Sequence, residues 1–113
     1  NYDAEAIKAV CDQLRARNLP PHVMVDCSHG NSLKDYNKQP VVAESLAAQI
    51  KSGSRSITGV MIESHLVAGR QDAKPGAPLS YGQSITDACV SWDTTEKVLE
   101  QLADSVRARR NAS

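Results

Sequence analysis

Two nearly continuous apolar runs of strand length constrain the fold of this chain more than any other feature. They cover residues 22–29 (HVMVDCSH) and 56–65 (SITGVMIESH), and both are rich in Val, Ile and Met. Runs of this kind suit strands that are covered on both faces, as in a parallel sheet. A third run, residues 84–89 (SITDAC), is shorter, and periodicity alone does not distinguish it from a loop.

Helical patterns lie before, between and after these runs. The spacing of apolar residues predicts helices over residues 3–17, 40–52 and about 94–109. Asp3 suits a cap at the start of the first helix, and Gly53 suits a cap at the end of the second. Each helix would place one apolar stripe against the sheet, made up of Ile7, Val10, Cys11 and Leu14, then Val42, Leu46 and Ile50, then Val98, Leu102 and Val106.

The order of the elements indicates the fold class. Asp93 and Glu96 have the spacing of a capping box, which would start the last helix. Helix, strand, helix, strand, long loop, strand and helix follow one another, which is the rhythm of repeated βα units in α/β proteins. Residues 67–83 form the long loop, and loops of this length usually carry function or are disordered.

Composition sets the outer limits. With 113 residues and 41% hydrophobic content, the chain can form one modest core, so we expect one domain over residues 1–113. Thirteen basic residues balance thirteen acidic ones, which argues against nucleic acid or an acidic membrane surface as a partner. The sequence has no bilayer-spanning run and no signal-peptide pattern. The three cysteines are an odd number, and none has the spacing of a paired motif, which favours a reducing compartment. We expect a cytoplasmic protein.

The two ends of the chain suggest a part of something longer. The sequence starts at Asn1 rather than Met and enters a helical pattern within three residues. It finishes shortly after a complete helix, in residues 109–113 (RRNAS). We therefore expect the C-terminal portion of a larger protein.

Three metal-ligand side chains, His29, Glu63 and Asp87, lie at or near the ends of the three apolar runs. The C-terminal ends of parallel strands share one face, so these side chains can converge on one divalent cation. Taken singly, a histidine such as His29 is more often a satisfied structural residue than a ligand, and Asp87 is more often a turn or cap residue. Glu63 is the strongest single candidate, because a carboxylate that ends so apolar a strand has a desolvation cost unless it is partnered.

Three motifs carry a resemblance to a known family. Residues 26–32 (DCSHGNS), 59–66 (GVMIESHL) and 81–89 (YGQSITDAC), followed by Trp92, resemble the C-terminal third of the class I 3-deoxy-D-arabino-heptulosonate 7-phosphate (DAHP) synthases. The similarity runs from about Pro21 to Arg109, with the motifs in order. It implies the last three strands and flanking helices of a (β/α)8 TIM barrel, which would be incomplete as an isolated chain.

The resemblance also implies a function. The family joins phosphoenolpyruvate to erythrose 4-phosphate and releases phosphate, as the first step of the shikimate route to aromatic amino acids. His29, Glu63 and Asp87 match three of the family's four protein metal ligands, and we expect a homo-oligomer. A set of imidazole and carboxylate ligands tolerates several divalent metals, such as Mn, Fe, Co or Zn.

The chemistry suggests roles for two of these residues. A divalent cation can polarise the aldehyde oxygen that carbon 3 of the enol attacks, and it can activate the water that adds to carbon 2. We expect Asp87 to lie nearest the aldehyde substrate and His29 nearest the enol, which makes both catalytic candidates. The family's fourth ligand, a cysteine, matches none of Cys11, Cys27 and Cys89. Most of its anion-binding Arg and Lys residues have no match here either, so we expect the isolated chain to be inactive.

Other residues have a functional and a plainer reading. His65 either orients a ligand or is an exposed loop residue, and Asp26 serves the site or only the core. Arg70 and Lys74 meet a phosphate or are solvated. Cys27 and Cys89 read as small buried hydrophobes, and Trp92 as packing at the start of the last helix.

Two rival functions stay open at the level of sequence. The first is a metal-free α/β binding module that is complete at this length. The second is a structural barrel fragment that self-associates through unpaired strand edges. A hydrolase built on Ser28 and His29 is disfavoured, because the glycine-flanked nucleophile elbow is missing.

Overall fold

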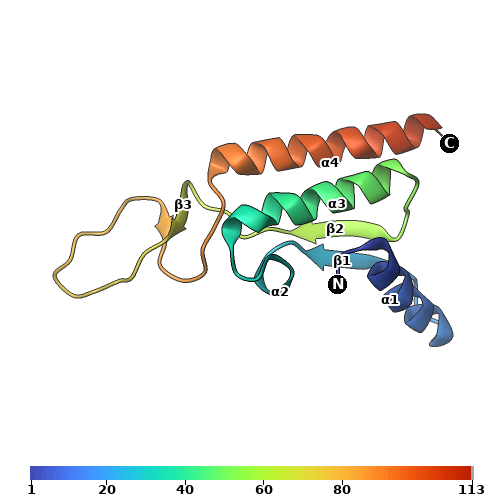
Figure 1. Ribbon diagram of the computed structural model, residues 1–113, viewed down its shortest axis with the longest axis horizontal. Helices are drawn as coiled ribbons and strands as arrows, with labels where there is room; N and C mark the ends of the chain where they lie inside the picture. The colour runs from blue at the N-terminus through green and yellow to red at the C-terminus, as the bar shows by residue number, and fades with distance from the viewer. Residues whose placement is uncertain (113) are drawn as a thin grey trace.

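A parallel βαβ unit forms the centre of the protein (Figure 1). The computed structural model describes residues 1–112. Strand β1 (Val23–Asp26) pairs in parallel with β2 (Ile57–Met61), and helix α3 (Gln39–Lys51) lies in the crossover between them. The parallel pairing of the first two runs is confirmed. The strands are shorter than predicted. After β1 the backbone enters a turn, in which the Asp26 side chain binds the Ser28 N–H, and then helix α2.

The turn after β1 is built from two short helical segments. These are α2 (His29–Ser32) and the 3-10 helix η1 (Tyr36–Lys38), which lead directly into α3. Pro40 in the first turn of α3 suits that position, because the missing N–H has no partner inside the helix there. At the other end, Gly53 has φ +115° and its N–H bonds to the Ile50 carbonyl, which confirms it as the glycine that closes the helix.

The predicted helices are all present. Helix α1 (Ala4–Ala16) starts at Asp3, whose carboxylate accepts a hydrogen bond from the Ala6 N–H, so the predicted cap is confirmed. Helix α4 (Trp92–Ala112) is longer than predicted and lies side by side with α3 (Figure 1). No helix within residues 1–112 combines the length and the apolar character needed to cross a membrane.

One hydrophobic core joins these helices to one face of the β1–β2 pair. Most of the predicted stripe residues belong to it, whereas Val10 on α1 is 41% exposed and Leu14 lies outside the core cluster. Leu102 and Val106 of α4 are partly buried against the core. The buried members are Ile7, Cys11, Val25, Cys27, Val42, Ala43, Leu46, Ile50, Ile57 and Val98.

The expectation that both faces of the sheet are covered is wrong for this chain. Val25 and Cys27 are buried in the core, but Met24, which precedes Val25 and points to the opposite face of the strand, is 70% exposed. Thr58 on β2 is exposed as well. The helices cover only one face of the two strands, so the opposite face is left open in the described part of the chain.

The third run does not form the predicted strand over residues 84–89. Strand β4 covers only Gln83–Ser84, and it pairs in parallel with β3 (Val67–Arg70), which lies inside the predicted loop. The hydroxyl of Ser84 accepts a hydrogen bond from the Thr86 N–H at 3.1 Å. Such a local side-chain bond competes with the sheet ladder and ends the strand. The two strands and the loop between them form an arm that projects from the body (Figure 1).

The start of α4 also differs from the prediction. The helix begins at Trp92, and the hydroxyl of Ser91 accepts a hydrogen bond from the Thr94 N–H at 3.2 Å. Ser91 is therefore the cap, and the predicted capping box at Asp93 and Glu96 is wrong. The backbone just before Ser91 explains the shift, because Val90 is fixed by hydrogen bonds with residues 63 and 65.

Candidate metal centre

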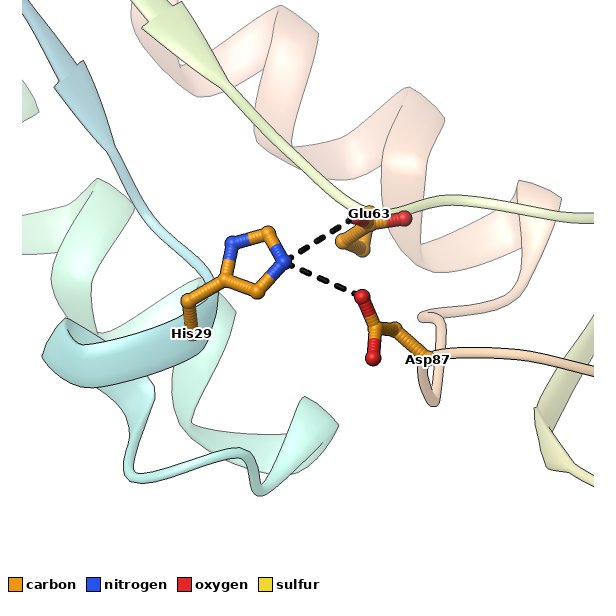
Figure 2. Close-up of side chains that lie close together, drawn as sticks. All are labelled: His29, Glu63 and Asp87. Atoms are coloured by element: carbon orange, nitrogen blue, oxygen red, sulfur yellow. Dashed lines mark hydrogen bonds and ion pairs between the residues drawn. The ribbon is translucent and has the colours of Figure 1, made fainter.

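His29, Glu63 and Asp87 come from three separate segments and point toward one another (Figure 2). His29 is the first residue of α2 and follows the end of β1 by three residues. Glu63 follows the end of β2 by two residues, and Asp87 lies between β4 and α4. All three sit beyond the C-terminal ends of strands, where the functional residues of parallel α/β folds gather. The predicted convergence is confirmed.

The distances between their polar atoms are short. His29 Nε2 lies 3.1 Å from Asp87 Oδ2 and 3.4 Å from Glu63 Oε1. One potential ligand atom from each residue lies within 4.8 Å of the other two. The side chains of His29, Glu63 and Asp87 are 39%, 31% and 60% exposed, so Asp87 is the most accessible of the three. A single ion can reach one donor atom from each residue.

A small cavity of about 30 Å³ lies against this cluster. Its size suits one ion or water molecule, for which about 10–15 Å³ of such space is enough. Lys34, Tyr36 and Gln39 are among the other residues that line it. A larger groove of about 580 Å³ lies between α1 and α3, but its lining contains no carboxylate and no imidazole. Of these two cavities, the candidate metal ligands line only the smaller one.

The position of Glu63 is fixed by a side chain that the sequence did not single out. Gln39, which is 2% exposed, accepts a hydrogen bond from the Glu63 N–H at 2.9 Å. Its amide also donates to the Glu63 carbonyl at 3.1 Å, and the Val90 N–H donates to the same carbonyl. A buried glutamine at the start of an apolar helix has no sequence signature. Only the fold shows that Gln39 holds the backbone of a candidate ligand.

The segment that carries Asp87 is held by its neighbours. Arg70 Nε donates to the Thr86 carbonyl at 2.8 Å, and Cys89 Sγ lies 3.4 Å from the Asp87 carbonyl. Arg70 also pairs with Asp72 at 2.7 Å. The Arg70 side chain is 48% exposed, so its guanidinium is partly solvated while it binds within the arm. A phosphate contact of Arg70 stays a prediction.

The backbone and ring of His29 are held by the turn that follows β1. His29 has φ +51°, a left-handed conformation that is uncommon for residues other than glycine. Asp26 Oδ1 accepts a hydrogen bond from the Ser28 N–H at 2.8 Å, and Asp26 Oδ2 lies 2.9 Å from His29 Nδ1. Asn31 Nδ2 donates to the Asp26 carbonyl at 2.8 Å. Of the two readings left open for Asp26, the structure supports a place at the site.

The electrostatics of the turn follow from these bonds. Hydrogen bonds to Asp26 and then Asp87 raise the pKa of His29 above its ordinary value. Burial acts to raise the pKa of Asp26, but hydrogen bonds from Ser28 and His29 outweigh it, so this pKa is lowered. Asp26 is therefore ionised at neutral pH and favours a positive charge on or near the imidazole.

The cysteines behave as the sequence predicts. All three are buried. Burial raises the pKa of the Cys27 thiol to about 11 and also raises that of Cys89. Thiols that resist ionisation are poor metal ligands, because the thiolate is the binding form. Cys89 Sγ lies 3.9 Å from Glu63 Oε2 and packs beside the cluster.

The remaining candidates lie outside the cluster. His65 is exposed, and its Nδ1 accepts a hydrogen bond from the neighbouring Leu66 N–H. Lys74 is exposed in the arm. Trp92 opens α4 as predicted but is 48% exposed, so it packs only in part.

Comparison with known proteins finds close similarity. The profile of the "DAHP synthetase I family" matches residues 1–100. A tyrosine-inhibited phospho-2-dehydro-3-deoxyheptonate aldolase from Schizosaccharomyces pombe is 58% identical over 97% of this chain and 31% of its own length. The Phe-sensitive enzyme of that name from Escherichia coli K12 is 48% identical over 97% of this chain and 31% of its own length.

A solved structure agrees with these matches. The phospho-2-dehydro-3-deoxyheptonate aldolase from Francisella tularensis SCHU S4 superposes with a TM-score of 0.91 at 48% identity. The match covers 96% of this chain and 31% of that one. This chain therefore spans about a third of the length of the relatives it matches.

Proposed function

Because this chain belongs to the DAHP synthetase I family, we propose that it forms the metal-holding segment of a synthase. The complete enzyme condenses phosphoenolpyruvate with erythrose 4-phosphate to give DAHP and phosphate. The observation that carries this proposal is the convergence of His29, Glu63 and Asp87 within 4.8 Å. Family membership also disfavours the alternative of an unrelated α/β binding module.

The donor set fits a divalent metal. One imidazole and two carboxylates suit the first-row divalent cations, and three protein ligands leave positions open for substrate. His29 presents Nε2 to the cluster, because Nδ1 is occupied by Asp26. Neutral imidazole with its second nitrogen hydrogen-bonded is the usual form of a histidine ligand. His29, Glu63 and Asp87 would hold the ion, which would supply a Lewis acid for the aldehyde oxygen.

The exposure of the three side chains suggests how the substrates approach. Asp87 has the most exposed side chain, at 60%, and lies on a segment outside the β1–β2 body. We assign it the place nearest the aldehyde. His29 lies at the end of β1, deeper in the fold, and we assign it the place nearest the enol. A carboxylate oxygen of Asp87 or Glu63 would accept the proton of the water that adds to carbon 2 of the enol substrate.

We also assign the chain to the last three strands of a (β/α)8 barrel. The parallel β1–β2 pair with α3 in its crossover is one βα unit and the next strand of such a barrel. The uncovered face around Met24 is what the interior face of an incomplete barrel would leave open. The cluster at the C-terminal ends of the strands matches the side on which barrel enzymes place their active sites. A homo-oligomeric state and a cytoplasmic location stay predictions from the sequence.

The ligand assignment is tested in the complete enzyme that carries this sequence. His29→Ala and Glu63→Ala should each lose most of the bound metal, measured by elemental analysis after dialysis, and lose turnover in parallel. His22→Ala is a matched control, because His22 is exposed at the opposite end of β1. Unchanged metal content in both cluster variants would refute the assignment.

The segment on its own should not turn over substrate. The cluster offers three ligands, and most of the cationic residues that the family uses for its anionic substrates have no match in this chain. We expect no DAHP formation above background from the purified 113-residue chain, assayed by phosphate release. Measurable synthase activity from this chain alone would contradict the proposal.

A further inference from the structure

We infer that Asp26 is a positioning residue that selects the metal-binding tautomer of His29, an inference that rests on the proposed metal centre. Asp26 is not itself one of the three converging ligands. Its carboxylate binds His29 Nδ1, the nitrogen on the far side of the ring from Glu63 and Asp87. A residue in this place decides which ring nitrogen has a free lone pair.

The contacts around His29 Nδ1 determine where the proton lies. Asp26 Oδ2 lies 2.9 Å from this nitrogen and can only accept a hydrogen bond when ionised. Ser28 Oγ lies 2.8 Å away and donates its own proton to Asp26 Oδ1. Both neighbours of Nδ1 are therefore acceptors. Nε2 faces the carboxylates of Asp87 and Glu63, so a cation bound between them takes the Nε2 lone pair, and Asp26 then holds the one ring proton on Nδ1.

The two oxygens of Asp26 have different tasks. Oδ1 accepts the Ser28 N–H at 2.8 Å and so shapes the turn, whereas Oδ2 binds the imidazole. The same turn places His29 at φ +51°, which is costly without support from such bonds. A merely structural Asp26 would need only the Oδ1 contact.

This division of tasks makes Asp26→Asn a sharp test. The backbone N–H of Ser28 needs an acceptor, so the new amide keeps its oxygen at the Oδ1 position and preserves the turn. Its NH2 group then faces His29 Nδ1 as a donor. The imidazole must accept there and carry its proton on Nε2, which removes the lone pair from the metal side. Replacing the carboxylate of an Asp–His pair by an amide imposes the wrong tautomer in this way.

The first readout is the tautomer itself, in the complete enzyme loaded with diamagnetic Zn²⁺. Nitrogen chemical shifts of the imidazole should show Nδ1–H with a metal-bound Nε2 in the wild type and Nε2–H in Asp26→Asn. Ser28→Ala is the matched control, because it removes a hydroxyl from the same network but leaves the Asp26–His29 pair, so its tautomer should match the wild type.

The second readout is Co²⁺ affinity, measured by titration calorimetry with the metal alone. We expect Asp26→Asn to bind Co²⁺ about 10–100-fold more weakly than the wild type, the usual effect of losing a partner of a ligating histidine. Ser28→Ala should stay close to the wild type. Unchanged affinity or an unchanged tautomer in Asp26→Asn would overturn the inference.

The outcomes separate this inference from the metal proposal. If His29→Ala bound Co²⁺ as tightly as the wild type, the metal proposal would fail, and the tautomer readout would still decide what Asp26 does to the ring. If Asp26→Asn failed to fold, as judged by circular dichroism, the wild-type tautomer alone would decide. An Nε2–H imidazole there would exclude the assigned role.

Discussion

The body of the protein and its projecting arm are stabilised in different ways. In the body, helices α3 and α4 bury apolar side chains against one face of β1 and β2, with Leu46 fully buried at the centre. In the arm, β3 and β4 form a minimal sheet, and Gln71 and Gln83 tie the strands together by side-chain bonds to backbone carbonyls. Burial of apolar side chains stabilises the body, whereas the arm depends on hydrogen bonds and on glycines with positive φ.

This contrast matters for the candidate centre, because the cluster joins the two regions. His29 and Glu63 follow the strands of the body, whereas Asp87 belongs to the segment that returns from the arm. Two of the three candidate ligands are thus supported by a packed core, and the third depends on the arm. A change in the arm can displace Asp87 without disturbing the other two.

The largest expected effect comes from the core of the body. Leu46→Ala should lower the free energy of unfolding by about 2–5 kcal/mol, because it leaves a cavity where a side chain is fully buried. Leu79→Ala in the arm, where the side chain is 53% exposed, should change it by less than about 0.5 kcal/mol. Denaturant unfolding of the complete enzyme measures both. Equal effects would mean that the arm is packed as tightly as the body.

A smaller effect is expected at a glycine of the arm. Gly82 has φ +78°, and a Cβ there would lie 2.9 Å from the Leu66 Cβ. Gly82→Ala should cost about 1–2 kcal/mol of backbone strain plus the steric overlap. Gly76 also has φ +78° but opens to free space, so Gly76→Ala carries only the strain.

Amide exchange at Val67, whose N–H bonds to the Gly82 carbonyl, reports this local destabilisation. Exchange should be fastest in Gly82→Ala and intermediate in Gly76→Ala. If the two variants exchanged alike, close packing between Leu66 and Gly82 would contribute nothing to the arm.

The junction between arm and body should show an effect of about 1 kcal/mol. Ser91→Ala removes the hydroxyl that caps α4, and such caps contribute about that much. Asp93→Ala should cost only a few tenths of a kcal/mol, through the lost interaction of its charge with the helix dipole. Thermal unfolding of both variants tests the assignment. If Asp93→Ala lowered stability more than Ser91→Ala, Asp93 would be the cap of α4, as the sequence predicts.

The smallest effect on stability is expected at the open face of the body. In the isolated chain, Met24→Lys should change the free energy of unfolding by less than about 0.5 kcal/mol, since Met24 is 70% exposed there. It should, however, reduce self-association of the isolated chain, because an open apolar face and unpaired strand edges promote pairing between copies. Light scattering over a range of concentrations compares Met24→Lys with Leu79→Ala, which alters the arm instead. If the Met24→Lys chain associated as strongly as the wild type, the contact between copies would lie on another surface.

Elements with a strong local signal were predicted well. The helices follow from the spacing of residues such as Val42, Leu46 and Ile50, because a 3.6-residue period can bury only one face. The caps at Asp3 and Gly53 were also correct, since each depends on the chemistry of one residue. The third run was misjudged, because the bond between Ser84 and Thr86 that ends the strand depends on local geometry rather than on periodicity.

The sequence by itself determined the helices, the parallel pairing of two strands, and the identity of the three side chains that meet at the strand ends. These follow from periodicity and from the rule that parallel strands end on one face. Only the tertiary structure decided that Gln39 holds Glu63, that Asp26 turns Nε2 of His29 toward the carboxylates, and that one face of the sheet is open. Those features are set by contacts between side chains and backbone groups whose positions depend on the whole fold.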